Sequence, residues 1–429
     1  MKRNFRLFLI LAMSSLTLIS CGKKDEEEIV ETGDTTEQVA FDDVEVEDYT
    51  VLKYNELEVL AYEDDTEAQV MLGRMLEYGT EDVKQDFTEA ISWYQMASDS
   101  GNVDGTCALG YFYLTGTGVD RDLEKASELF DIAIEGGCKN AYVGKARVLL
   151  AGLTDEDLKS VCNPPVSSTD EESKIETDET DETEESEESE ETSEESKLSD
   201  DELAQKVDDI YNLIYKAQID GDIDGSYYLG YAYEKGIGVK GDFKRAFDYY
   251  SRAAKSESAD LADQYAKNKA NTALGLLYLN GNGVEADSEK AMDYLEVASD
   301  NGYAKASYYL GQICENGLGV DKNYEQAMEY YLLAADLDYA PALNQVGYMY
   351  YNGYGVDVDF ASAVYYQKLA ALQGYAIAQV NLGFLYENGY GVERNLETAL
   401  SYYEMAADSG YEGATEAVVR VKAQINEEM

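Results

Sequence analysis

The residue types that most often perform chemistry are unevenly supplied in this sequence of 429 residues. Histidine is absent, which removes the usual general base at neutral pH and the commonest ligand for zinc and copper. Asp and Glu number 87, and a pair of carboxylates could in principle cleave a glycosidic bond. Nothing in their spacing singles out two of them. We therefore predict no catalytic residue, no metal site and no cofactor, and keep a hydrolase acting through unidentified carboxylates as an alternative.

The five cysteines lack the paired spacing of a metal site. In an oxidising compartment a disulfide could join Cys107 to Cys138, or Cys138 to Cys162, and the sequence leaves both pairings open. Cys314 takes a place that tyrosine fills elsewhere in the chain, and we expect it to be a buried filler.

The sequence Gly-x-Gly-Val recurs six times and invites comparison with a nucleotide-binding loop. A dinucleotide loop needs a preceding strand and a fuller glycine spacing. Here the preceding residues have helical periodicity, and the motif returns throughout the chain. We therefore predict a structural turn.

The elements that carry these turns repeat every 36 residues, as the spacing of Gly311, Gly347 and Gly383 shows (347 − 311 = 36 and 383 − 347 = 36). A period of this length indicates stacked, identical supersecondary units. Each unit predicts a first helix, the glycine turn, and a second helix capped by Asp or Asn, such as Asp359. The second helix should end at a left-handed glycine such as Gly374, a place that Asp64 and Asp338 take in two instances.

Glycine inside the first helix costs roughly 1 kcal/mol relative to alanine, so its recurrence needs a cause. We expect close approach of the partner helix, with alanines at the facing positions.

The N-terminus predicts a secretion signal over residues 1–20, with Lys2, Arg3 and Arg6 before a short apolar run. Leu18-Ile19-Ser20-Cys21 resembles the bacterial lipobox, in which the signal is removed and the cysteine carries the lipid. A plain signal peptide is the alternative. With lipid on Cys21, the protein would sit on the extracytoplasmic face of a bacterial membrane.

The remaining chain divides by composition. We expect an acidic disordered tether (21–48), repeats with a capping helix (49–152), an acidic disordered insertion (153–198), and repeats ending in a capping helix (199–429). Our hypothesis makes the insertion a long loop within one unit, so that the stack continues across it. The alternative is two arrays joined by a linker.

Positions that recur in register within the units, such as Leu229-Gly230, Gly236-x-Gly238-Val239 and Tyr249-Tyr250, resemble those of Sel-one-like repeats, which are related to tetratricopeptide repeats. The resemblance implies a right-handed all-α solenoid of about eight two-helix units that acts as an adaptor between proteins and not as an enzyme. A cysteine-rich branch of that family staples each unit with a disulfide, and this chain lacks that cysteine spacing.

Net charge of −54 argues against nucleic acid as a partner, because binding to phosphates depends on Lys and Arg. We expect a concave surface that binds a protein or peptide, preferably a basic one. Tyr348, Tyr354 and Tyr390, beside the glycine turns, are the candidate binding residues, because a ring with a polar tip suits an interface. A receptor for cell-wall or capsule glycan is the alternative.

Overall fold

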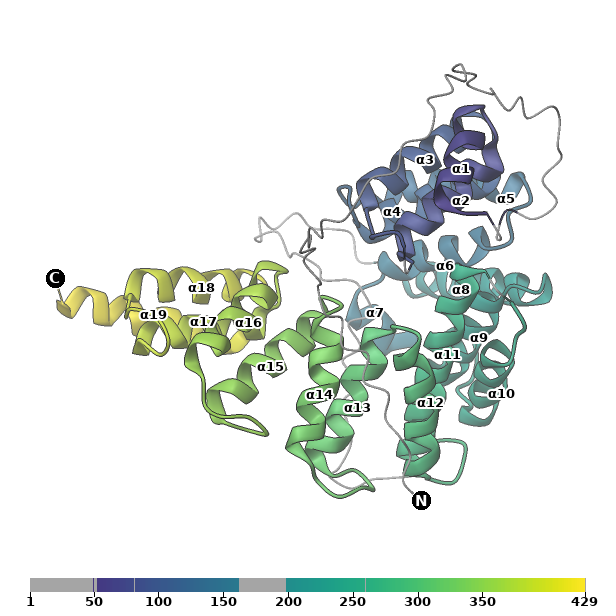
Figure 1. Cartoon of the computed structure of the whole chain (residues 1–429). Coiled ribbons are helices and arrows are strands. Elements are labelled where there is room, and N and C mark those ends of the chain that lie inside the picture. Colours follow the sequence, from purple (N-terminus) through teal and green to yellow (C-terminus); the bar gives the residue numbers. More distant parts are fainter. Residues whose placement is uncertain (1–48, 50–51, 81, 162–197, 259, 429) are drawn as a thin grey trace, which may run out of the picture. The chain divides into compact units, whose positions relative to one another are not determined.

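The computed structural model describes residues 49, 52–80, 82–161, 198–258 and 260–428. Regular secondary structure in these residues consists only of helices, labelled α1 to α19 in Figure 1. Sixteen helices form eight pairs, and the second helix of each pair packs on the first helix of the next. This arrangement is an α-helical solenoid, as predicted. The pairs are α2 (Thr66–Tyr78) with α3 (Phe87–Asp99), α4 (Val103–Thr115) with α5 (Leu123–Glu135), α6 (Ala141–Ala151) with α8 (Asp200–Ile219), α9 (Ile223–Lys235) with α10 (Phe243–Ala254), α11 (Leu261–Asn280) with α12 (Ser288–Asp300), α13 (Ala304–Asn316) with α14 (Tyr324–Ala335), α15 (Ala340–Asn352) with α16 (Phe360–Leu372), and α17 (Ala376–Asn388) with α18 (Leu396–Asp408).

Three helices lie outside the pairs. α1 (Tyr54–Tyr62) packs on α2, and α19 (Glu412–Glu428) packs on α18, so each end of the stack is covered by a single helix. The short helix α7 (Asp155–Val161) lies in the segment where we expected only disorder, and Leu158 and Val161 pack against the neighbouring core. The expected signal peptide, Cys21, the tether and Cys162 fall outside the described residues.

Local sequence explains where each second helix begins and ends. Asp359 caps α16 by accepting hydrogen bonds from the backbone N–H groups of Ala361 and Ser362, and the corresponding Asp or Asn caps the other second helices of the repeats that contain the glycine turn. Among the described residues, the only non-glycine residues with positive φ are Asp64 (66°) and Asp338 (57°). These are the two positions predicted to replace the terminal glycine.

The recurrent glycine of the first helix is explained by close contact, although not with alanine. A Cβ added to Gly230 would lie 2.7 Å from the ring of Tyr250, and one added to Gly311 would lie 2.6 Å from the ring of Tyr331. At most of these glycines an aromatic ring of a second helix therefore lies against the bare backbone, and Leu295 and Gln367 take its place at Gly275 and Gly347. Our expectation of facing alanines was wrong. The ring needs this space because its hydroxyl reaches across to the first helix: Tyr331 donates to Glu315 at 2.6 Å. The same pairing recurs as Tyr94 with Glu77, Tyr250 with Glu234, and Tyr403 with Glu387.

The stack continues from α6 to α8, although residues 152–199 intervene in the sequence. Val143 and Ala146 of α6 share one buried cluster with Val207 and Ile210 of α8. Ser199 opens α8 with the predicted capping box, in which its side chain and that of Glu202 each bond the other's backbone N–H. The α6–α8 pairing favours the hypothesis that the acidic segment is a loop within one unit.

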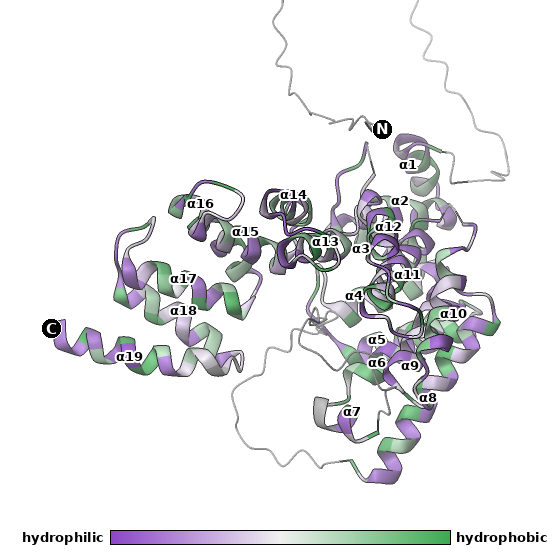
Figure 2. Ribbon diagram, turned by 90° about the horizontal axis from the view of Figure 1, so that it is seen from below, coloured by the Kyte–Doolittle hydropathy of each residue, from purple (hydrophilic) through white to green (hydrophobic). Residues whose placement is uncertain are grey.

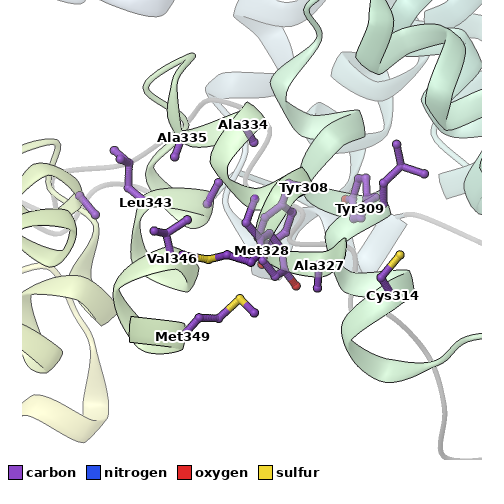
Figure 3. Packing of buried hydrophobic residues seen from close by; sticks show 14 of the residues in the cluster. Tyr308, Tyr309, Cys314, Ala327, Met328, Ala334, Ala335, Leu343, Val346 and Met349 are labelled. Atoms are coloured by element: carbon purple, nitrogen blue, oxygen red, sulfur yellow. The ribbon is translucent and has the colours of Figure 1, made fainter. Parts of the chain in front are cut away.

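The apolar core runs between the helices and joins successive pairs. Figure 3 shows one part of it, where Tyr308, Met328 and Val346 come from three different helices, α13, α14 and α15. Polar and apolar positions alternate along the helices in Figure 2, as expected when one face of each helix is buried. Within the described part of the chain, none of the helices has both the length and the apolar character needed to cross a bilayer.

Candidate binding surface

In five of the six units with the Gly-x-Gly-Val turn, the turn rests on the start of the preceding unit's second helix, and the exception is Gly238, which lies against Val207 and Tyr211 within α8. Gly355 has a φ of 68°, and a Cβ there would collide with the backbone carbonyl of Tyr324, the first residue of α14. Gly391, one unit later, lies in the same way against the backbone of Phe360 at the start of α16. Side chains that flank the turn are thereby brought next to the first residue of the previous second helix.

Three aromatic rings meet at the first of these two contacts. Tyr354 lies between the turn glycines, and its ring stacks on that of Tyr324 with centroids 4.7 Å apart and planes 12° from parallel. Tyr348, which follows the helix glycine Gly347, meets Tyr354 edge to face at 6.0 Å. Both arrangements are favourable geometries for aromatic pairs.

The same three positions are aromatic one unit later (324 + 36 = 360, 348 + 36 = 384, 354 + 36 = 390). Tyr390 lies 5.1 Å from Phe360 and 5.9 Å from Phe384. Tyr351 joins this second triad, with its ring 5.5 Å from Phe360. We call the seven residues the aromatic ladder: Tyr324, Tyr348, Tyr351, Tyr354, Phe360, Phe384 and Tyr390.

Part of the ladder faces solvent. Tyr348 is 41% exposed, Phe384 39% and Tyr390 36%, whereas Tyr354 is half-buried. All three residues predicted from the sequence thus belong to the ladder, with Tyr348 and Tyr354 in direct contact and Tyr390 in the second triad. Sequence reasoning missed Phe384, although adding one period to Tyr348 leads to it. Tyr324, Tyr351 and Phe360 were missed as well.

The three units that carry the ladder are acidic. Residues 304–411 contain 13 Asp and Glu against 4 Lys and Arg, a net charge of −9 (4 − 13). One of those four cations, Lys322, already lies over the Tyr324 ring at 4.5 Å from its centroid. Burial, followed by the nearby Tyr354 and the charge of Glu315, raises the pKa of Tyr348, so its hydroxyl stays neutral at physiological pH. The surface therefore offers neutral rings inside a negative field, which suits a cationic group.

The three cysteines among the described residues, Cys107, Cys138 and Cys314, are buried. Cys107 and Cys138 are buried free thiols in one cluster, and a hydrogen bond with Cys138, together with burial, raises the pKa of Cys107 well above its usual value. The alternative pairing with Cys162 lies outside the described residues. Cys314 is buried, as expected of a filler, and burial raises its pKa to about 11. The described residues include no group of three or more Cys, Asp or Glu side chains arranged to hold a metal ion.

A family model matches this pattern of helices and turns directly. The Sel1 repeat matches seven times, over residues 66–102, 103–138, 223–258, 268–303, 304–339, 340–375 and 376–411. The chain belongs to the Sel1 repeat family. Sel1 repeats are in general scaffolds for protein–protein interaction. The third helix pair, α6 with α8, falls between two matches and is the pair that the acidic segment interrupts.

Solved structures similar to this Sel1 repeat protein include other members of the family. A Sel1 repeat protein from Oxalobacter formigenes is 22% identical, with 86% of this chain and 90% of that chain covered and a TM-score of 0.47. The protective antigen c5321 of uropathogenic Escherichia coli is 19% identical, with 87% and 91% covered and a TM-score of 0.30. The comparison with curated proteins found no match to this chain.

Proposed function

We propose that this Sel1 repeat protein is a lipid-anchored scaffold of the bacterial cell envelope that binds a protein partner through the aromatic ladder. One observation carries the proposal: the same aromatic triad occurs twice, one unit apart, with Tyr348, Phe384 and Tyr390 more than one-third exposed. Rigid rings contribute large contact areas and lose little conformational entropy on binding, which makes them frequent anchors of protein interfaces.

A basic partner fits this surface best. The excess of carboxylates over residues 304–411 attracts a positively charged segment, and the ring faces can accept Lys or Arg side chains. Lys322 over Tyr324 is an example of such a contact within the chain.

Capture from an envelope fraction tests the ladder. The full chain is cross-linked to the fraction, and the amount of the trapped basic protein is compared with that trapped by a variant carrying Tyr348→Ser and Phe384→Ser. We expect the variant to trap at least about tenfold less of this protein, because it loses two exposed aromatic anchors. Tyr365→Ser is the matched control, since Tyr365 is 59% exposed but lies outside the ladder. Equal capture by the ladder variant and the control would contradict the proposal.

Two further measurements separate the proposed protein partner from a glycan. Capture of a basic protein should weaken as salt is raised from low to physiological concentration, because charge attraction across a solvent-exposed interface is screened. If the ladder variant instead loses retention on cell-wall or capsule polysaccharide columns while protein capture is unaffected, the ladder is a glycan surface and the proposal is wrong.

Anchoring rests on the lipobox-like sequence that ends at Cys21. Cys21→Ser should move the protein from the membrane fraction to the medium or the soluble envelope fraction, since one covalent lipid would be its attachment. Unchanged partitioning into detergent would refute lipidation at this residue.

A further inference from the structure

The fifth unit is longer than the others at its start. Gly230 and Gly275 are 45 residues apart, nine more than the period, and the family matches leave residues 259–267 unassigned. The additional residues extend the first helix of this unit: α11 has 20 residues, whereas α13, α15 and α17 have 13 each. Asp260 caps the extension by accepting a hydrogen bond from Ala262 N–H at 2.9 Å.

This extension contacts the first unit, 186 residues earlier in the chain. The Asp260 carboxylate forms an ion pair with Arg74 of α2, and both side chains are partly buried. One turn further along α11, the ring of Tyr265 lies 6.2 Å from that of Tyr78, which is one turn beyond Arg74 in α2. An acidic side chain and a ring on one helix thus match a basic side chain and a ring on the other.

Arg74 occupies a position that recurs in every unit. It directly follows the helix glycine Gly73, as Tyr348 follows Gly347 and Phe384 follows Gly383. In the seventh and eighth pairs this position is exposed and belongs to the aromatic ladder, whereas in the first pair it is covered by α11. In the first pair, the extension therefore covers the position that is exposed in the seventh and eighth pairs.

A second anchor holds α11 to its own neighbourhood. Lys269 is 7% exposed, and its Nζ lies 2.6 Å from Oδ1 of Asp224 in α9, as a contact of charges without the alignment of a directed hydrogen bond. The same ammonium group lies 4.8 Å from the ring centroid of Tyr228 and 5.4 Å from that of Tyr265. Tyr265 thus takes part both in the contact of α11 with α2 and in the cluster around Lys269. If the contact with α2 were lost, α11 would still be attached to α9.

We propose that the start of α11, from its cap Asp260 to Lys267, is an internal ligand of the first unit, which holds α11 against α2 and closes the position of Arg74 to other molecules. The insertion provides the two features that the α2 surface fits, a carboxylate for Arg74 and an aromatic ring for Tyr78. A competing partner would have to offer the same chemistry, an acidic side chain followed one turn later by a ring. This site therefore prefers an acidic ligand, whereas the ladder prefers a basic one.

Deletion of residues 259–267 tests the closure, because it restores the 36-residue spacing (45 − 9 = 36) and leaves every family match intact. Tyr78→Cys is introduced into the full chain with and without the deletion, and maleimide labelling at residue 78 is followed by mass spectrometry. We expect labelling to be about tenfold faster or more after the deletion, because the cover over residue 78 is gone. Equal labelling rates would overturn the proposal.

Point variants keep the test decisive if the deletion fails to fold. Arg74→Gln removes the ion pair, and Asp260→Asn does so while keeping a good helix cap. We expect backbone amides of Gln264 to Lys267 in α11 to exchange about tenfold faster in either variant, while those of α13 are unchanged. Unaltered exchange in α11 would show that the extension is held only by its own unit, which would also overturn the proposal. Neither result depends on the ladder or its partner.

Discussion

The first five helix pairs differ from the last three, and the contrast is clearest at one point of the repeat, between the first pair and the last two. The residue after the helix glycine is Arg74 in the first pair, where Asp260 of α11 covers it, and Tyr348 and Phe384 in the last two pairs, where it is exposed. The packing beneath is alike in both regions, with a ring over the helix glycine at Gly230 and at Gly383. The repeat therefore determines the position of this side chain. Whether the side chain is exposed depends on whether another segment of the chain, such as the start of α11, packs over it.

The caps of the first helices differ between the regions as well. Asp222 and Asp260 cap α9 and α11 with their side chains, whereas α13, α15 and α17 begin after tyrosines that make no capping bond. The first region thus places polar capping side chains, such as the buried Asp222, where the second places rings. The predictions below test which of these differences matter, from the largest expected effect to the smallest.

Substitutions at the helix glycine should change the free energy of unfolding most, and by equal amounts in the two regions, because both regions share this packing. Gly230→Leu and Gly383→Leu each force a side chain into the rings of Tyr250 and Tyr403, and we expect each to lower the free energy of unfolding by about 4 kcal/mol. Gly347→Leu should cost a similar amount, because it meets the buried side chain of Gln367, whose amide donates a hydrogen bond to the Asn344 carbonyl at 3.0 Å. Denaturant melts measure all three, with Lys368→Leu on the exposed face of α16 as the control. An unchanged melt for Gly383→Leu would mean that the helices are not in close contact there.

The pH dependence of stability should distinguish the regions next. Burial, and then the charge of Asp224, raise the pKa of Asp222 to about 7 from a usual value near 3.8. The folded state therefore binds a proton that the unfolded state releases, so this group makes the protein less stable as pH rises from about 4 to 7. Asp222→Asn keeps a capping side chain and should recover about 3 kcal/mol at pH 8 relative to pH 4.

Thermal melts of the wild type and Asp222→Asn across this pH range measure the difference. Because carboxylates remote from Asp222 titrate equally in both proteins, the difference between the two curves is attributed to Asp222 and its interaction with Asp224. Parallel curves would show that the Asp222 carboxylate is not perturbed in the folded state.

Substitutions at the two aspartates with positive φ should change the free energy of unfolding less, and again by similar amounts in the two regions. Asp64→Gly and Asp338→Gly relieve a positive φ at the end of α1 and of α14, and each should raise the free energy of unfolding by about 0.5–1 kcal/mol. Urea melts measure the gain, and Gly374→Asp, at the equivalent end of α16, should show a loss of similar size. A loss of stability in Asp338→Gly would mean that its side chain, and not its backbone, matters there.

Addition of one aromatic ring to the ladder should have the smallest effect of these substitutions. In the sixth pair Gln312 takes the place of Tyr348, and it is half-buried. Gln312→Tyr should strengthen binding of the captured partner by about threefold, as expected for one added peripheral ring. Titration of the labelled partner measures this change. Lys145→Tyr, at the equivalent position of the third pair, is the control. It should leave the affinity for the partner unchanged, because that position is remote in sequence from the ladder.

Much of the fold could be predicted because its causes are local. The period of 36, the Asp and Asn caps, and the left-handed places of Asp64 and Asp338 all depend on residues within one unit. The partner of the helix glycine was predicted wrongly because small and aromatic residues alternate along the second helix. Only the structure shows that the flat ring of Tyr331, and not an alanine, faces Gly311.

The candidate sites were less predictable because they combine residues from different units. Tyr348, Tyr354 and Tyr390 were identified by their closeness to turns, but Tyr324 and Phe360 belong to the preceding unit, and local patterns do not reveal that the turn rests on them. The contact of Asp260 with Arg74 spans 186 residues, and its only trace in the sequence is the excess of nine residues before Gly275.

The pairing of α6 with α8 has a consequence for how this chain tolerates change. Since both helices share one buried cluster, a backbone cut between residues 162 and 197 should yield two fragments that co-purify without a covalent link. The acidic segment can then vary in length, receive a fused domain or be nicked by a protease, while the eight helix pairs stay in one assembly.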